Sequence, residues 1–249
     1  MQSDLASVRS LGYRLISLSA IVDSFLTDKL KRYQGERVLG MSFDDGPDYD
    51  WHDYEGDDLG FMPSFHTILK AHGEMAFEFN KPFSTSFVIA SPKARQELDK
   101  SCIAGRNQWQ DLWWRQCVET NIIEIGNHSW DHVHESLSSV ALESQIKGSF
   151  FAVNNLENAR LQIKQAHEYI SRHLSGEYSH LFAYPYGHVS DYLRDEYFPN
   201  YQNEHWQRAA FTTESAPITF GANRWALPRF VCGQHWKSSE ELVKLIQSL

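Results

Sequence analysis

Apolar side chains recur along the chain with two periodicities, one typical of helices and the other of buried strands. In the first 34 residues they recur at intervals of three and four, which predicts one helix from Leu5 to Lys31 as an N-terminal helical extension (residues 1–34). A short apolar run from Arg37 to Phe43 follows Gly35 and predicts a strand. This strand leads directly into two adjacent carboxylates.

The same two patterns alternate through the rest of the chain. They predict helices at Phe65–Ala71, Trp109–Glu119, Leu142–Leu174 and Glu240–Leu249, and strands at Ser84–Ile89, Ile122–Gly126, Leu181–Tyr184, Ala209–Thr213 and Trp225–Val231. Strands that alternate with helices favour a parallel sheet, open or closed into a barrel, so the expected fold class is α/β. A length of 249 residues fits a single domain over residues 1–249.

Charge and cysteine content exclude several classes of function. The formal net charge of -9 repels phosphate backbones, so no nucleic-acid partner is expected. The three cysteines, Cys102, Cys117 and Cys232, form no CxxC pair, which argues against a disulfide scaffold and against a cysteine-built zinc site. The apolar run from Leu15 to Val22 is too short for a transmembrane segment and makes a poor secretory signal, so we expect a cytoplasmic protein.

Two adjacent carboxylates, Asp44 and Asp45, stand at the end of the first predicted strand. Neighbouring side chains on an extended strand point in different directions, so one can bind a cation while the other faces a substrate. Gly46 permits a tight turn and Pro47 fixes the exit of the chain. A plain Asp-Asp-Gly turn is the alternative when the pair is considered alone.

Two histidines follow the third predicted strand in the string GNHSWDHVH. If this stretch forms a helical turn, His128 and His132 project from one face and can share a divalent ion. Asp131 or Asn127 is expected to orient a ligand imidazole, whereas His134 lies off that face. Imidazole nitrogen combined with carboxylate oxygen is typical of hydrolytic metal sites.

The acidic segment from Asp48 to Gly60 is predicted to be a solvated or substrate-rimming loop. It lacks the spacing of an EF-hand calcium loop. The chain also contains no GxSxG, Walker or GxGxxG motif, so serine-hydrolase, P-loop and Rossmann functions have no support.

Three strings of residues resemble the motifs of one known family, in the family's order. MSFDDGP at 41–47, HSWDH at 128–132 and FAYPYG at 182–187 resemble the motifs of the polysaccharide deacetylases, the NodB-homology or carbohydrate esterase 4 group. The resemblance implies a distorted (β/α) barrel, here with an extra N-terminal helix. It also implies hydrolysis of an N-acetyl group on an N-acetylated carbohydrate, which would be the substrate.

The resemblance also implies a role for each matching residue. Asp44 would be the general base, and Asp45, His128 and His132 would hold the metal. The backbone N–H of Tyr186 would donate to the oxyanion. The metal would be a divalent ion; Zn2+ is our first expectation, since two imidazoles and one carboxylate suit it, and Co2+, Ni2+ or Fe2+ are alternatives.

The sequence departs from the family pattern at two places. Ala183 stands where the common third motif has an arginine, and Arg229 in LPRF could reach the same spot from a later strand end. The final L-x-H motif, the source of the general acid, has no clean match. His235 in CGQHW is the first substitute and His188 the second.

Three functions are therefore compared. The first is a metal-dependent deacetylase of N-acetylated sugars. The second is a C–N hydrolase of the same superfamily that acts on a small linear or cyclic amide. The third is an inactive carbohydrate-binding relative, which the two departures favour and the complete metal-ligand set opposes.

Overall fold

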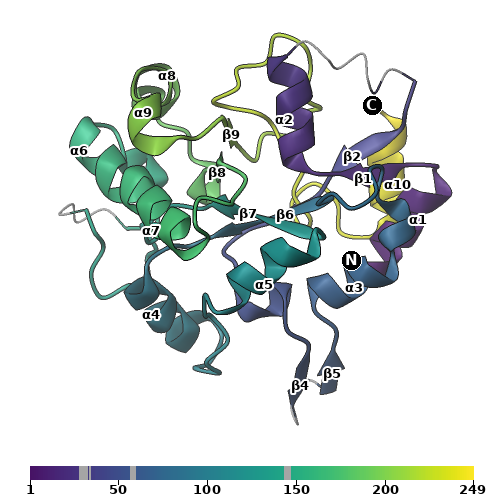
Figure 1. The fold of residues 1–249 in the computed structure, drawn as a ribbon, viewed down its shortest axis with the longest axis horizontal. Helices are drawn as coiled ribbons and strands as arrows, with labels where there is room; N and C mark the ends of the chain where they lie inside the picture. Colours follow the sequence, from purple (N-terminus) through teal and green to yellow (C-terminus); the bar gives the residue numbers. More distant parts are fainter. Residues whose placement is uncertain (28–32, 34, 57–59, 143–146) are drawn as a thin grey trace.

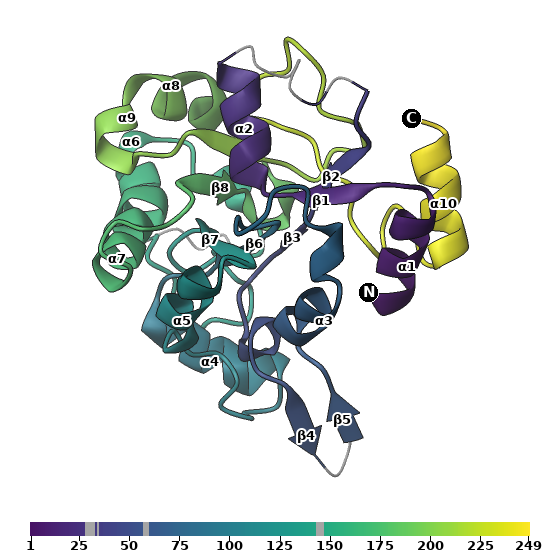
Figure 2. The same ribbon diagram turned by 45° about the vertical axis from the view of Figure 1, so that its right-hand side comes forward.

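A five-stranded parallel sheet forms the centre of the molecule. The computed structural model describes residues 1–27, 33, 35–56, 60–142 and 147–249. In spatial order the strands are β3 (Ser42–Phe43), β6 (Ser84–Val88), β7 (Ile123–Asn127), β8 (Leu181–Ala183) and β9 (Ala209–Phe211), and every neighbouring pair is parallel (Figures 1 and 2). This is the half-barrel sheet of an α/β fold, and it brings the carboxyl ends of all five strands to one edge.

Side chains on alternate strand positions pack into different apolar clusters on the two faces of the sheet. On β8, Leu181 and Ala183 join one cluster with β9, whereas Phe182 between them joins another. All three are fully buried. The sheet is therefore covered on both faces, which explains why β8 and β9 appear in the sequence as continuous apolar runs and not as alternating ones.

Helix α2 (Leu18–Leu26) covers the face to which Leu181 and Ala183 belong. Its Leu18 and Val22 pack in the same cluster as these two strand residues. Glu124 on β7 is buried and accepts a hydrogen bond from the backbone N–H of Ser19 in the first turn of α2. A carboxylate at a helix N-terminus offsets the unpaired N–H groups and the positive end of the helix dipole. The N-terminal segment thus closes one side of the sheet.

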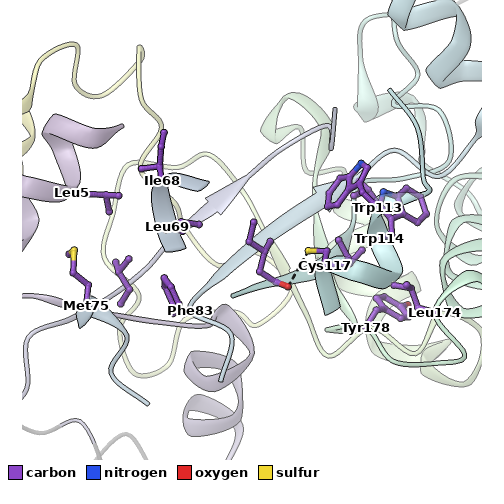
Figure 3. Close-up of a cluster of buried hydrophobic side chains, with 14 of the residues drawn as sticks. Leu5, Ile68, Leu69, Met75, Phe83, Trp113, Trp114, Cys117, Leu174 and Tyr178 are labelled. Carbon is purple, nitrogen blue, oxygen red and sulfur yellow. Dashed lines mark hydrogen bonds between the residues drawn. The ribbon is translucent and has the colours of Figure 1, made fainter. Parts of the chain in front are cut away.

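The opposite face of β6 and β7 packs against a larger cluster. Figure 3 shows side chains of this cluster from α1 (Gln2–Ser10), α3 (Phe65–Ala71) and α5 (Trp113–Thr120). Helices α7 (Gln165–His173) and α10 (Ser239–Gln247) also contribute to it. The two terminal helices, α1 and α10, lie side by side (Figures 1 and 2). Their contact joins the two ends of the described chain.

The remaining regular elements lie around the sheet. A short parallel pair joins β1 (Arg14–Ile16) to β2 (Val38–Gly40), and an antiparallel pair, β4 (Tyr54–Gly56) and β5 (Gly60–Met62), projects from the body (Figure 2). The other α-helices are α4 (Pro92–Cys102), α6 (Leu156–Ala159), α8 (Phe198–Asn200) and α9 (Gln202–His205). Two π-helical turns lie at Arg160–Lys164 and Tyr192–Tyr197. Short 3-10 turns lie at Asp48–Asp50, Gly73–Met75, Phe150–Ala152 and Pro185–Gly187.

Several predicted elements differ in the structure. The single N-terminal helix is wrong: strand β1 separates α1 from α2, because Gly12 takes a positive φ that ends the first helix. The predicted helix from Leu142 begins only at Leu156, where Asn155 caps it. The predicted strand at Trp225–Val231 forms only an isolated bridge at Leu227. Residues 28–31 of the predicted N-terminal helix and residues 143–146 of the predicted helix from Leu142 lie outside the described chain.

Other elements agree closely with the sequence pattern. Helix α3 has the predicted bounds, and β6, β7, β8 and β9 start within one residue of theirs. Helix α4 was missed, although Ser91 caps it and Pro92 occupies its first turn. No helix in the described residues is long and apolar enough to cross a membrane.

The centre of the sheet has no room at Gly126. A Cβ atom on this residue would lie 2.5 Å from Cδ1 of Phe87, a ring that is fully buried on the neighbouring strand. We expect Gly126→Ala to lower the free energy of unfolding by about 1–3 kcal/mol in urea titrations. Gly73→Ala, which adds a Cβ with no atom within 4 Å, serves as the control and should change stability by less than about 0.5 kcal/mol. Equal stability of the two variants would contradict this packing.

Candidate functional site

The first strand of the sheet ends in the carboxylate pair. Strand β3 stops at Phe43, and Asp45 and Gly46 then take positive φ values of 76° and 67°. A Cβ on Gly46 would lie 2.5 Å from Cγ1 of Val88, so only glycine lets the turn pass this close to β6. The turn is tightened by the side chain of Trp109, whose indole N–H donates to the Asp45 carbonyl at 3.1 Å.

The histidine pair follows β7 on an irregular loop. The expected helical turn is wrong, because Ser129 and His132 have φ values of 72° and 64°, in the left-handed region. The loop is held by its own polar side chains: Asn127 accepts from the Ser129 N–H at 2.8 Å, and the Ser129 hydroxyl accepts from the His132 N–H at 2.9 Å. Local hydrogen bonds of this kind replace those of a helix.

The two imidazoles and one carboxylate converge despite the absence of a helix. Nε2 of His128 and Nε2 of His132 each lie 3.5 Å from Oδ1 of Asp45. Ligand atoms about 2.1 Å from a tetrahedral ion are separated by roughly 3.4 Å, so these distances fit a metal centre. Within the described residues, these three side chains make up the group able to hold a metal ion.

The orientation of His128 is set by the neighbouring strand. Its Nδ1 lies 2.8 Å from the carbonyl oxygen of Ala183, so a proton on Nδ1 is donated there and leaves the lone pair on Nε2. Ala183 stands where the family pattern has arginine, and here its backbone supplies the orienting acceptor. Nδ1 of His132 is buried and has no hydrogen-bond partner among the described residues.

Asp131 and Asn127 do not orient the ligand imidazoles as expected. The Asp131 carboxylate accepts hydrogen bonds from the Val133 N–H, the Ala141 N–H and the Gln162 amide. Asn127 donates to the Ile163 carbonyl in addition to its contact with Ser129. Both side chains therefore fix the shape of the loop and act on the histidines only through the backbone.

Burial disfavours the charged forms of His132 and Asp45. Desolvation holds the pKa of His132 well below its ordinary value, and the neighbouring His128 and His134 lower it further. Desolvation and the adjacent Asp44 raise the pKa of Asp45, against the opposing effect of His128. A divalent ion binds to a neutral imidazole and to an ionised carboxylate. Any proton on Asp45 would therefore be released when the ion binds.

Arg229 forms a bidentate ion pair with Asp44. Its Nη1 and Nη2 donate to the two carboxylate oxygens at 2.7 and 2.9 Å, and a bidentate pair of this kind fixes orientation as well as charge. Although desolvation raises the pKa of Asp44, Arg229 and the two ligand histidines outweigh it and lower the pKa to about 2. The structure thus brings Arg229 to the carboxylate from the far side of the sheet, 185 residues along the chain.

Aromatic side chains lie next to the candidate metal ligands. Tyr186 has a φ of 58°, and its ring meets the edge of His132 at a centroid distance of 4.4 Å. The ring centroid of His134 lies 5.6 Å from that of His132, and the ring centroid of His188 lies 5.3 Å from that of Tyr186. His188, the second candidate for the general acid, is therefore one ring removed from a metal ligand.

His235 is held within its own loop. Its Nδ1 accepts from the Val231 N–H at 2.7 Å, and its ring meets that of Phe230. No hydrogen bond, ion pair or ring contact in the described chain joins it to the Asp45–His128–His132 group.

The acidic segment after the motif contains two residues that the sequence assigned to a solvated or rimming loop. Asp48 and Asp50 are instead buried, and Asp50 accepts from the Ser86 hydroxyl on β6 at 2.5 Å. Burial, with smaller contributions from Asp45 and Asp44, raises the pKa of Asp50 to about 8, against the effect of its bond to Ser86. A protonated Asp50 adds no third negative charge behind the pair. Residues 57–59 of this segment lie outside the described chain.

The convergence of Asp45, His128 and His132 gives a direct prediction for metal binding. We expect the protein to bind one divalent ion per chain, and Asp45→Ala, His128→Ala and His132→Ala each to lose most of it, because three ligands are few to begin with. Elemental analysis after dialysis against Zn2+ measures this. His235→Ala is the matched control and should keep its metal; full metal content in His128→Ala would contradict the assignment.

Comparison with solved structures finds the same fold in two bacterial proteins. A deacetylase from Streptococcus pyogenes, PplD in complex with acetate, is 15% identical with a TM-score of 0.60; the match covers 98% of this chain and 84% of that one. IcaB from Ammonifex degensii is 17% identical with a TM-score of 0.60, over 99% of this chain and 87% of that one. A comparison with curated protein sequences finds no match.

Comparison with family models places the motifs in a family. The polysaccharide deacetylase model matches residues 31–198, a stretch that contains both metal-ligand motifs and Tyr186. The reaction of this family is hydrolysis of the acetamide of a carbohydrate, and the family is metal-dependent. From the motif order, the fold and the family match together, we conclude that this chain belongs to the polysaccharide deacetylase family.

Proposed function

We propose that this chain removes acetyl groups from N-acetylated sugars at the site formed by Asp44, Asp45, His128 and His132. The observation that supports it most is the placement of both imidazole Nε2 atoms 3.5 Å from one oxygen of Asp45. A divalent ion held there would polarise the acetamide carbonyl and acidify a water. Zn2+ suits two nitrogens and one oxygen with a position left open, and Co2+, Ni2+ and Fe2+ are the alternatives.

Asp44 acts as the general base in this proposal. Its side chain is 34% exposed, so water can reach the carboxylate, while Arg229 is only 11% exposed and fixes it from behind. The ion pair lowers the pKa of Asp44 to about 2, so the carboxylate is ionised at neutral pH. A base within hydrogen-bond reach of the attacking water contributes typically about 10²- to 10⁴-fold to the rate.

The backbone of Tyr186 acts as the oxyanion donor. The left-handed conformation of Tyr186 places it at the tip of a tight turn closed by two hydrogen bonds, from Gly187 to Tyr184 and from His188 to Pro185. The Tyr186 N–H takes part in neither of these bonds. A preorganised N–H of this kind is worth roughly 3–4 kcal/mol in the transition state.

The leaving nitrogen must be protonated by an acid, and His188 is the better placed of the two candidates. Its Nδ1 is buried without a hydrogen-bond partner among the described residues, and its ring adjoins Tyr186. His235 stays a sequence-based prediction. The cytoplasmic location and the single catalytic domain over residues 1–249 also stay predictions, the latter supported by the packing of α2 on β8 and β9.

The test of this function is acetate release from a panel of N-acetylated glycans, with and without a chelator. We expect release from at least one glycan, loss of release with the chelator, and recovery when metal is added back. Asp44→Asn should keep its metal and lose about 10²- to 10⁴-fold in kcat, because it keeps the shape of the side chain but cannot take a proton. Full activity in Asp44→Asn would remove the base assignment, and release from small amides alone would favour the C–N hydrolase alternative.

The ion pair with Arg229 gives a prediction for pH dependence. A folded-state pKa of about 2 keeps Asp44 ionised in the wild type down to strongly acidic pH. Arg229→Gln removes the positive charge that lowers this pKa, so Asp44 should take up its proton at a pH higher by about 1–3 units. The acidic limb of kcat/KM against pH should move upward accordingly. Arg115→Gln, whose wild-type guanidinium donates to the His173 carbonyl instead, should leave the limb unchanged.

A further inference from the structure

A row of rings leads away from the metal ligands to the surface. It starts at His132, passes to Tyr186 at 4.4 Å and to His188 at 5.3 Å, and ends at Phe151, which stacks on His188 at 4.4 Å with an interplanar angle of 13°. Each distance joins ring centroids, and each lies in the range of direct aromatic contact. The row therefore continues the site and is not a separate cluster.

Phe151 presents a free aromatic face at the end of this row. One face of its ring is covered by His188, yet 53% of the residue is exposed, so the other face is open to solvent. Single exposed apolar residues are ordinary and need no explanation. Ten large apolar residues are exposed in the described chain, but the ring contacts there connect only Phe151 and Tyr186 to a metal ligand.

The backbone on both sides of Phe151 is fixed to the catalytic loops. Gly148 donates its N–H to the carbonyl of Val133, next to the ligand His132, at 2.9 Å. The Ser190 hydroxyl, two residues after His188, donates to the carbonyl of Val153 at 2.6 Å. Phe150 and Val153 are fully buried in the core. Phe151 is thus an exposed ring on a rigid turn, which keeps the entropic cost of binding low.

We propose that Phe151 is a specificity-determining residue that stacks on a pyranose ring next to the sugar being deacetylated. The proposal rests on the proposed function of the site and adds a binding position for a second sugar of an oligosaccharide or polysaccharide substrate. The apolar C–H face of a pyranose matches the open face of the phenyl ring. Because the row of rings extends outward from His132, the sugar that stacks on Phe151 is the neighbour of the reacting sugar in the oligosaccharide.

The experiment compares Phe151→Ala with the wild type on N-acetylglucosamine and on its tetramers of different linkages. We expect the KM for at least one tetramer to rise roughly three- to tenfold, the loss of one aromatic contact, with kcat changed by less than about twofold. Activity on the monosaccharide should fall by a smaller factor than activity on the tetramer, because only the tetramer places a second sugar on Phe151. Phe151→Trp should retain the wild-type KM for the tetramer, and Phe220→Ala, which removes a phenyl ring that is 65% exposed and makes no recorded ring contact in the described chain, is the matched control.

Binding of the same tetramers, measured by calorimetry, separates failure of the subsite from failure of the function. If the wild type releases no acetate but binds a tetramer with an affinity that Phe151→Ala weakens, the subsite stands and the proposed function fails. An unchanged KM and affinity in Phe151→Ala would overturn the subsite, as would equal losses on the monosaccharide and the tetramer. Absence of tetramer binding by the wild type would overturn it too.

Discussion

The structure depends above all on bringing two imidazole nitrogens and one carboxylate oxygen together in a partly buried place. In the absence of a cation this arrangement is costly, because Asp45 and His132 are both moved away from their ordinary protonation behaviour by desolvation. The three side chains stay together because they follow strand ends that are fixed by the sheet and by the packing of its two apolar faces. A bound divalent ion would compensate the buried charge. The rigidity of the fold would therefore contribute to the affinity for the metal.

A second constraint separates the two neighbouring carboxylates. Asp44 and Asp45 are adjacent in sequence, yet the positive φ at Asp45 sends them to different partners, Arg229 and the histidines. One carboxylate has its pKa lowered by a guanidinium, and the other has its pKa raised by burial. Two similar groups placed in different environments take different roles, as acid–base chemistry requires. Burial also raises the pKa of the nearby Asp50, which disfavours a third negative charge in the region.

The third constraint is the reach of the site beyond the reacting bond. The turn that carries Tyr186 also carries His188, and His188 supports the exposed Phe151 from another loop. Hydrogen bonds from Gly148 and Ser190 hold that loop to the segments that carry His132 and His188. Chemistry and recognition of the neighbouring sugar would therefore share one rigid framework.

The sequence by itself determined the strands β6 to β9 and helix α3, because short strand-forming runs and a capped helical stretch are local signals. It also selected Asp45, His128 and His132 as candidate metal ligands, since their residue types and motif order can be read without a structure. It could not determine that His128 and His132 meet on an irregular loop, because that loop is stabilised by Asn127, Ser129 and Asp131 through bonds specific to this fold. Nor could it place Arg229 on Asp44 or Phe151 on His188. Those contacts join segments distant along the chain, and only the packing of the sheet and its loops brings them within reach.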